Sequence, residues 1–200
     1  DLALQLVDAA AQAGADIVKF QTFSADRLVT QTAPKAEYQK RTTPSSEPQR
    51  AMLQKLELTP EMHQAIIRQC QKKQIEFLST AFDIESIDLL AQLGQKKFKI
   101  PSGEITNLPL LRHIGKKNQP IIMSTGMADM REIKDAIQAL KQAGTTPQNI
   151  TILHCTTAYP TSMAEVNLQA MLTIKRETGL AVGYSDHTVG IEVPVAAAAL

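Results

Sequence analysis

The stretch Lys97-Phe-Lys-Ile-Pro-Ser-Gly-Glu104 decides the fold, because it joins a buried strand to a polar turn. Phe98 and Ile100 have the alternating spacing of strand residues that face a core, and Lys99 stands between them. Pro101 has no N–H to donate to a sheet, so the strand is expected to end there. A hydroxyl, a glycine and a carboxylate follow at once. Polar groups in this position mark the edge at which parallel α/β proteins bind ligands.

Similar strands recur along the chain, separated by amphipathic helices. The expected strands cover residues 17–23, 76–82, 97–104, 120–127, 150–160 and 180–188. The expected helices cover residues 2–13, 60–74, 83–93, 108–117, 129–143, 165–177 and the Ala-rich end of the chain. Strands that alternate with helices in this way form a parallel sheet.

Either a doubly wound sheet or a (β/α)8 barrel has this alternation, and two features favour the barrel. Polar side chains end every expected strand, whereas an open sheet gathers its site at one switch point. The last expected strand also places Ala181, Gly183, Ser185 and His187 on one face, and such small residues suit a crowded barrel axis. Six strands do not close an eight-stranded barrel. We therefore expect an incomplete (β/α)8 barrel, residues 1–200, with a first strand upstream and an eighth downstream.

The strand at residues 17–23 carries a second polar pair. Alternation puts Val18 and Phe20 on one face, and Lys19 and Gln21 on the other. If the apolar pair faces the helices, then Lys19 and Gln21 point inward, where they need a ligand or a partner group. A long connection, residues 24–58, follows on the same side as Lys19, with a short helix expected within it at 47–56. Loops of this length are either disordered or functional lids.

Composition excludes several classes of function. The chain has 44% hydrophobic and 20% charged residues and a net charge of +1, so nothing indicates a nucleic-acid or membrane partner. No apolar run is long enough to span a bilayer, and no signal peptide is expected from these residues. Cys70 and Cys155 are expected to be buried thiols in a reducing cytoplasm. Neither glycine-rich signature of nucleotide binding is present.

The strand ends together resemble the sialic acid synthase family, in its bacterial neuraminate and legionaminate branch. The resemblance covers nearly the whole chain, in order, through the segments 18–22, 77–80, 99–104, 123–127, 154–160 and 185–188. It implies a (β/α)8 barrel followed by an antifreeze-protein-like domain, in a dimeric, cytoplasmic enzyme. It also implies that this chain is a partial synthase domain, without that second domain and without the first and eighth strands.

The resemblance further implies condensation of phosphoenolpyruvate with N-acetylmannosamine or a closely related 2-acetamido aldose, with C–O cleavage and release of phosphate. Cations and hydroxyl donors suit the anionic substrate. The residues that correspond to phosphoenolpyruvate contacts are Lys19, Thr80, Lys99, Ser102, Ser124 and Ser185. The residues that correspond to sugar contacts are Gln21, Tyr159 and Thr157, the last of which stands where many relatives have Asn.

A divalent cation, with Mn²⁺ expected first and Mg²⁺ or Co²⁺ as alternatives, is implied as an activator of the sugar aldehyde. His187 matches a family metal ligand, and Glu104, together with Lys99, is the catalytic candidate, Glu104 for proton transfer. His154 lies on the same face of its expected strand as apolar residues that are expected to be buried. It is therefore expected to be a packed, hydrogen-bonded residue. His63 and His113, which lie on helices, are expected at the surface.

Two alternatives remain open from the residues. A class I aldolase would form a Schiff base between Lys99 and a keto acid, which requires a lowered lysine pKa. A catalytically silent barrel would bind a sugar phosphate, although such a site needs fewer polar strand ends. The acceptor of a synthase also stays open among N-acetylmannosamine, its 6-phosphate and a diacetamido trideoxy sugar.

Overall fold

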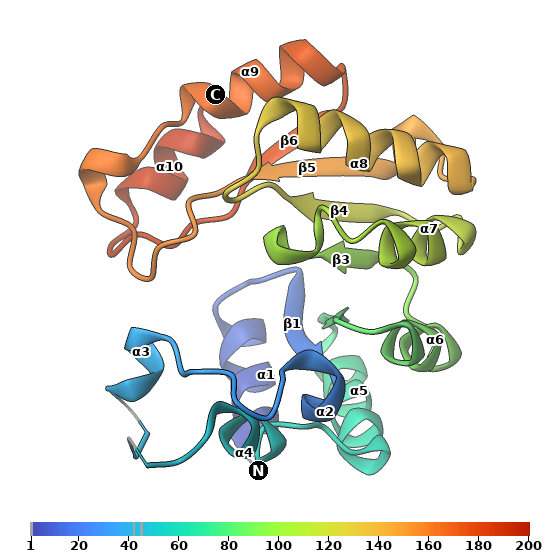
Figure 1. Ribbon diagram of the computed structural model, residues 1–200, viewed down its shortest axis with the longest axis vertical. Coiled ribbons are helices and arrows are strands. Elements are labelled where there is room, and N and C mark those ends of the chain that lie inside the picture. The colour runs from blue at the N-terminus through green and yellow to red at the C-terminus, as the bar shows by residue number, and fades with distance from the viewer. Residues whose placement is uncertain (1, 42, 45) are drawn as a thin grey trace. The chain divides into compact units, whose positions relative to one another are not determined.

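The computed structural model describes residues 2–41, 43–44 and 46–200, and it divides into two compact units, Asp1–Gln95 and Lys96–Leu200 (Figure 1). Asp1, and Thr42 and Ser45 of the expected long connection, lie outside the described residues.

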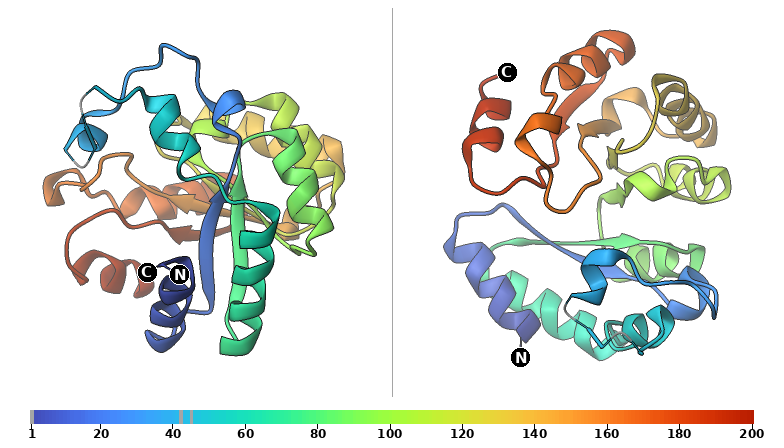
Figure 2. Two further views of the ribbon diagram at one scale, coloured as in Figure 1. Left: turned by 90° about the horizontal axis from the view of Figure 1, so that it is seen from below. Right: turned by 60° about the vertical axis from the view of Figure 1, so that its left-hand side comes forward.

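The first unit contains two long strands and the helices that precede and follow them. Its main elements are α1 (Leu2–Gln12), β1 (Ile17–Thr22), α5 (Pro60–Lys73), β2 (Glu76–Ala81) and α6 (Ile84–Gln92). β1 and β2 pair in parallel, as the blue and green strands of Figure 2 show. Thr59 caps α5 by accepting from the Met62 amide, and Asp83 caps α6 by accepting from the Ser86 amide. The expected helix start at residue 60 is therefore confirmed, and the helix expected from residue 83 begins one residue later.

The core of this unit lies between the two strands and helices α1 and α5. Val7, Ile66, Cys70 and Ile75 form its buried centre. The expected apolar face of β1, Val18 and Phe20, packs against this cluster together with Phe77 of β2. Because strand side chains alternate, Lys19 and Gln21 lie on the opposite face, as predicted.

The connection between β1 and α5 contains more helix than the sequence predicted. It holds α2 (Ala25–Leu28), α3 (Glu37–Lys40) and α4 (Gln49–Gln54), whereas one short helix at 47–56 was expected. Helices of four residues are too short to show an amphipathic period, so α2 and α3 leave no pattern in the sequence.

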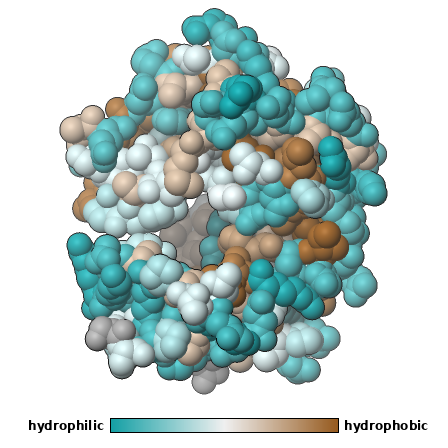
Figure 3. Space-filling model, viewed as in Figure 1, coloured by the Kyte–Doolittle hydropathy of each residue, from teal (hydrophilic) through white to brown (hydrophobic). Residues whose placement is uncertain are grey.

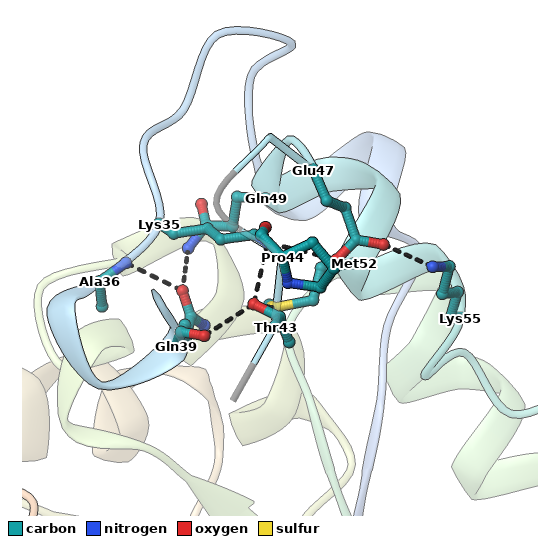
Figure 4. Close-up of polar contacts among 9 residues, drawn as sticks. All are labelled: Lys35, Ala36, Gln39, Thr43, Pro44, Glu47, Gln49, Met52 and Lys55. Atoms are coloured by element: carbon teal, nitrogen blue, oxygen red, sulfur yellow. Dashed lines mark hydrogen bonds and ion pairs between the residues drawn. The ribbon is translucent and has the colours of Figure 1, made fainter. Parts of the chain in front are cut away.

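A buried lysine holds the middle of this connection together (Figure 4). The Lys35 ammonium donates to Oγ1 of Thr43 at 2.9 Å and to the carbonyl of Pro44 at 2.8 Å. It also pairs with Oε2 of Glu47 at 3.2 Å, and its side chain is only 4% exposed. Lys55 pairs with the other oxygen of Glu47. The described part of the connection is thus tied by its own polar contacts.

The second unit contains four parallel strands that pair in chain order. Its strands are β3 (Phe98–Ile100), β4 (Ile121–Ser124), β5 (Ile150–His154) and β6 (Ala181–Tyr184). Its α-helices are α7 (Leu108–Lys116), α8 (Met130–Ala143), α9 (Gln169–Thr178) and α10 (Glu192–Ala198). Its 3-10 turns are η1 (Ser102–Glu104), η2 (Pro147–Asn149) and η3 (Met163–Glu165). Helices α7 and α8 lie side by side (Figure 1), and a Cβ on Gly115 of α7 would come within 2.6 Å of Cβ of Ala143.

Several expected boundaries in this unit are wrong. The helix expected from Glu165 begins at Gln169, because Glu165 closes the separate turn η3 and Val166 is extended. Strands β5 and β6 end at His154 and Tyr184, well before the expected ends, because the polar residues that follow run as loops. An isolated parallel β-bridge between Thr161 and Thr188 pairs the backbones of these two loops.

The strand faces of the second unit follow the expected alternation. Ile100, Met123 and Ile152 are fully buried on one face. The register pairs Ile122 with Thr151 and Ser124 with Leu153 on the other face.

Hydrophilic residues cover much of the molecular surface that is drawn in Figure 3. Among the described residues, no helix is both long and apolar enough to cross a membrane.

Candidate active site

In the first unit, three of the predicted site residues share one face of the β1–β2 pair. The register places Gln21 beside Thr80 and Lys19 beside Leu78. Thr80 is 2% exposed, and within the described part of the chain its hydroxyl has no hydrogen-bond partner. A buried hydroxyl without a partner is costly, so a ligand that accepts or donates there would satisfy it. Lys19 is exposed, yet desolvation by its surroundings lowers the pKa of its ammonium group.

In the second unit, Lys99 and Ser124 meet at the carboxyl ends of β3 and β4. The Lys99 ammonium donates to Oγ of Ser124 at 2.7 Å and to the carbonyl of Ile100 at 2.8 Å. Ser124 is 5% exposed, so the pair brings a cation and a hydroxyl together in a largely buried position. Ammonium and hydroxyl donors of this kind bind carboxylates and phosphates.

Ser102, which follows β3, contacts residues that follow the ends of β4 and β5. Its Oγ accepts from the amide of Gly126 at 2.9 Å and lies 3.3 Å from Sγ of Cys155. A Cβ on Gly126 would lie 2.1 Å from Oγ1 of Thr157 and 3.0 Å from Oγ of Ser102. An added Cβ would therefore force the side chain of Thr157 to shift and would crowd that of Ser102, both of which are predicted substrate contacts.

Glu104 is held by the start of the next helix. Its Oε2 accepts from Nδ2 of Asn107 at 2.6 Å, while Oδ1 of Asn107 caps α7 by accepting from the Leu110 amide at 3.2 Å. The carboxylate of Glu104 is thus oriented by a residue that is itself fixed by the helix end.

His187 and Tyr159 lie together beyond the ends of β6 and β5. Their ring centroids are 4.4 Å apart. Nδ1 of His187 lies 2.7 Å from the carbonyl oxygen of Thr156, which can only accept, so Nδ1 carries the proton. In a neutral ring, the lone pair then belongs to Nε2, the arrangement usual for histidines that bind metals. Within the described residues, no group of three His, Cys, Asp or Glu side chains could hold a metal ion.

The remaining predicted residue, Ser185, follows β6 directly, and its amide donates to the carbonyl of His154 at 2.9 Å. The side chain of Asp186 accepts from the amide and the hydroxyl of Thr188, at 3.0 and 2.8 Å. This turn fixes the backbone on either side of His187.

A cavity of about 710 Å³ adjoins Thr157 between the ends of α8 and α9. His154, which was expected to be packed and hydrogen-bonded, is instead half-buried and lines this cavity. Burial lowers the pKa of His154, against the opposite effect of a hydrogen bond to the Asn167 backbone. Its Nε2 has no partner within the described residues. None of the described residues that line the cavity is Lys or Arg.

His63 contradicts the sequence prediction. It was expected at the surface of its helix, but it is fully buried and bonded to Thr22 and Thr59. The helical spacing places His63 one turn from Ile66, on the core face. The prediction put His63 at the surface because histidine is a polar residue type. His113, also expected at the surface, is half-buried on α7.

These elements define a parallel α/β protein whose cations, hydroxyls and carboxylate follow the carboxyl ends of its strands. A model of the NeuB family matches residues 6–200. The chain therefore belongs to the NeuB family, which confirms the resemblance found in its strand ends.

Two curated relatives cover essentially the whole chain. The N,N'-diacetyllegionaminic acid synthase of Campylobacter jejuni is 54% identical over 100% of this chain and 60% of the relative. The synthase of the same name from Legionella pneumophila is 51% identical over 98% of this chain and 56% of the relative. The chain thus spans well under two thirds of the length of either relative.

Solved structures establish the fold class. The N-acetylneuraminic acid synthetase of Leptospira borgpetersenii, crystallised with citrate, matches 99% of this chain and 64% of its own with a TM-score of 0.82 and 31% identity. A phospho-2-dehydro-3-deoxyheptonate aldolase of Thermotoga maritima matches 92% of this chain and 47% of its own with a TM-score of 0.63 and 14% identity, a likeness of fold alone. The predicted fold, an incomplete (β/α)8 barrel, is confirmed.

Proposed function

We propose that the full-length protein is a nonulosonic acid synthase. It condenses phosphoenolpyruvate with a 2-acetamido aldose and water, and it releases phosphate. The observation that carries this proposal is the Lys99–Ser124 pair, a cation and a hydroxyl held 2.7 Å apart at the carboxyl ends of neighbouring parallel strands. Membership of the NeuB family and the names of the 54% and 51% identical relatives support it.

The anionic substrate is proposed to bind through charge-assisted hydrogen bonds. Lys19 and Lys99 supply the cations, and the hydroxyls of Thr80, Ser102, Ser124 and Ser185 supply further donors. The partnerless hydroxyl of Thr80 supports this assignment, because a ligand oxygen would satisfy it. Gln21, Thr157 and Tyr159 are proposed to contact the sugar.

The reaction joins C3 of the enol pyruvate to the aldehyde carbon of the open-chain sugar. Water adds at C2, the C2–O bond to phosphate breaks, and the aldehyde oxygen takes up a proton. We assign to Glu104 the acceptance of the proton that the attacking water loses; Asn107 orients the Glu104 carboxylate by a 2.6 Å hydrogen bond. Lys99 keeps the anion in place throughout, since the substrate and the departing phosphate both carry negative charge.

His187 is proposed as a metal ligand through Nε2. The fit rests on its Nδ1, which donates to the Thr156 carbonyl and so leaves the lone pair on Nε2. A divalent cation, Mn²⁺ first and Mg²⁺ or Co²⁺ as alternatives, would supply Lewis-acid polarisation of the aldehyde. We further propose that the full-length enzyme is a cytoplasmic homodimer, as the resemblance implies.

The identity of the acceptor sugar is the most specific part of the proposal. Two relatives above 50% identity are named as N,N'-diacetyllegionaminic acid synthases, which favours a diacetamido trideoxy sugar over N-acetylmannosamine or its 6-phosphate. The test is an assay of the full-length protein with phosphoenolpyruvate, Mn²⁺ and each of the three acceptors in turn, with phosphate release and the nine-carbon product measured. Phosphate release that requires one acceptor supports the proposal. Turnover with a keto acid in place of phosphoenolpyruvate would favour the aldolase.

A further inference from the structure

A buried chain of hydrogen bonds runs behind the carboxyl ends of β1 and β2. His63, on α5, is fully buried, and its Nε2 lies 2.8 Å from Oγ1 of Thr22. Oγ1 of Thr22 lies 2.7 Å from Oγ of Ser79. The second ring nitrogen of His63, Nδ1, lies 2.9 Å from the carbonyl oxygen of Thr59. The chain therefore links both strands to the first turn of α5.

The chemistry of the two ends fixes the direction of every hydrogen bond in this chain. The Thr59 carbonyl can only accept, so Nδ1 of His63 carries a proton. In the neutral ring the lone pair then belongs to Nε2, which accepts. The Thr22 hydroxyl therefore donates to His63, and the Ser79 hydroxyl donates to Thr22.

The chain lies directly behind two residues of the candidate site. The register pairs Gln21 with Thr80, and side chains alternate, so their neighbours Thr22 and Ser79 point to the opposite, helix-covered face. The amide side chain of Gln95 adds to the support, because it bonds both the N–H and the carbonyl of Ser79, at 2.7 and 3.1 Å. The backbone that carries Gln21 and Thr80 is thus held from behind.

We propose that His63 is a positioning residue, which acts through Thr22 and Ser79 to fix the backbone at Gln21 and Thr80. This inference rests on the proposed function, in which those two residues contact the sugar and phosphoenolpyruvate. His63 touches neither substrate in this assignment.

The tautomer gives a test that needs no enzymatic activity. In full-length protein labelled with ¹⁵N-histidine, and assigned by comparison with His63→Phe, the His63 ring should show a protonated Nδ1 and an unprotonated Nε2. A protonated Nε2, or exchange between tautomers, would overturn the proposed chain.

Variants of the full-length protein test the positioning role. His63→Phe removes both bonds and keeps a ring, so KM for both substrates should rise about two- to tenfold, the worth of a neutral hydrogen bond, with kcat little changed. Amide exchange at Gln21 and Thr80 should also quicken. His63→Gln offers Thr22 an acceptor again and should recover part of both effects.

Ile66→Ala is the matched control, because Ile66 is buried on the same helix but has no polar link to the strands. It should lower stability without raising KM or quickening exchange at Gln21 and Thr80. If it changes them as much as His63→Phe does, or if His63→Gln recovers nothing, then His63 is only a core residue. If the wild-type protein has no synthase turnover, the proposed function fails, and the tautomer and amide exchange still decide the role of His63.

Discussion

The ammonium of Lys99 donates to the hydroxyl of Ser124 at 2.7 Å, across the carboxyl ends of β3 and β4. This contact and the bond to the Ile100 carbonyl orient the cation. A charge that is already oriented loses less freedom when an anion binds, so this geometry supports the proposed contact of the pair with phosphoenolpyruvate.

Lys99→Met should act mainly on phosphoenolpyruvate binding, because the ammonium pairs with an anion present before and after bond formation. The loss of a charge-assisted contact is worth about 1.5–3 kcal/mol, which is roughly ten- to a hundredfold and should appear mostly in KM. Steady-state kinetics of the full-length variant measures it. If borohydride traps a substrate adduct in the wild type and not in Lys99→Met, the class I aldolase hypothesis replaces the proposed synthase function.

Glu104→Gln should act on the chemical step. The amide keeps the shape and an oxygen for Asn107, but it removes the charge that accepts a proton. We expect kcat to fall by on the order of a hundredfold or more, with KM for phosphoenolpyruvate nearly unchanged. Glu177→Gln, at the surface end of α9, is the control and should be silent. A wild-type kcat in Glu104→Gln would make Glu104 a structural acceptor for Asn107.

His187→Ala should lower metal affinity and activity together, because it removes the proposed Nε2 ligand. We expect metal affinity to fall by more than about tenfold, since changes even to groups that only support a ligand cost that much. Metal content after dialysis and the metal concentration for half-maximal activity measure it, with His113→Ala as the control. If His187→Ala retains wild-type metal content and only turnover changes, His187 is not a ligand.

Asp83 should make the stability of the first unit depend on acid pH. Burial alone would raise the pKa of Asp83, but hydrogen bonds from the amide and hydroxyl of Ser86 and from the Ser24 amide, with the charge of Arg27, leave it below its ordinary value of 3.8. A carboxylate with a lowered pKa stabilises the fold fully above its unfolded value, and this contribution is lost as pH falls through the lowered pKa.

Asp83→Ala should therefore cost about 0.5–2 kcal/mol at pH 7, the worth of a helix N-cap, and less at each pH below about 3.8. Urea unfolding of the full-length protein between pH 3 and pH 7 measures the difference from the wild type. Asp83→Asn keeps a capping oxygen and should lose less at pH 7. A cost of Asp83→Ala that stays constant to the lowest pH would contradict the lowered pKa.

The sequence predicted those features of the fold that depend on local alternation. The faces of β1 were predicted correctly, because Val18 and Phe20 differ so clearly from Lys19 and Gln21. The starts of α5 and α6 were also predicted to within one residue, since a helix start needs only one capping side chain, here Thr59 or Asp83, next to a helical period.

Features that depend on distant partners could not be predicted. His63 is buried because Thr22 and Thr59 satisfy both its nitrogens, and Thr22 is 41 residues away in the chain. The bonds of Lys35 inside the connection, and the orientation of Glu104 by Asn107, likewise depend on how the loops fold. Whether the predicted residues act as assigned stays a prediction.

The close approach at Gly126 has a consequence for how this protein can vary. Any side chain there would meet Oγ1 of Thr157 at 2.1 Å and Oγ of Ser102 at 3.0 Å. Positions 102, 126 and 157 therefore form one coupled set, in which the effect of a change at one depends on what stands at the other two. A combinatorial library at these positions should recover viable combinations whose single changes are each inactive, a pattern of epistasis that scanning one position at a time would miss.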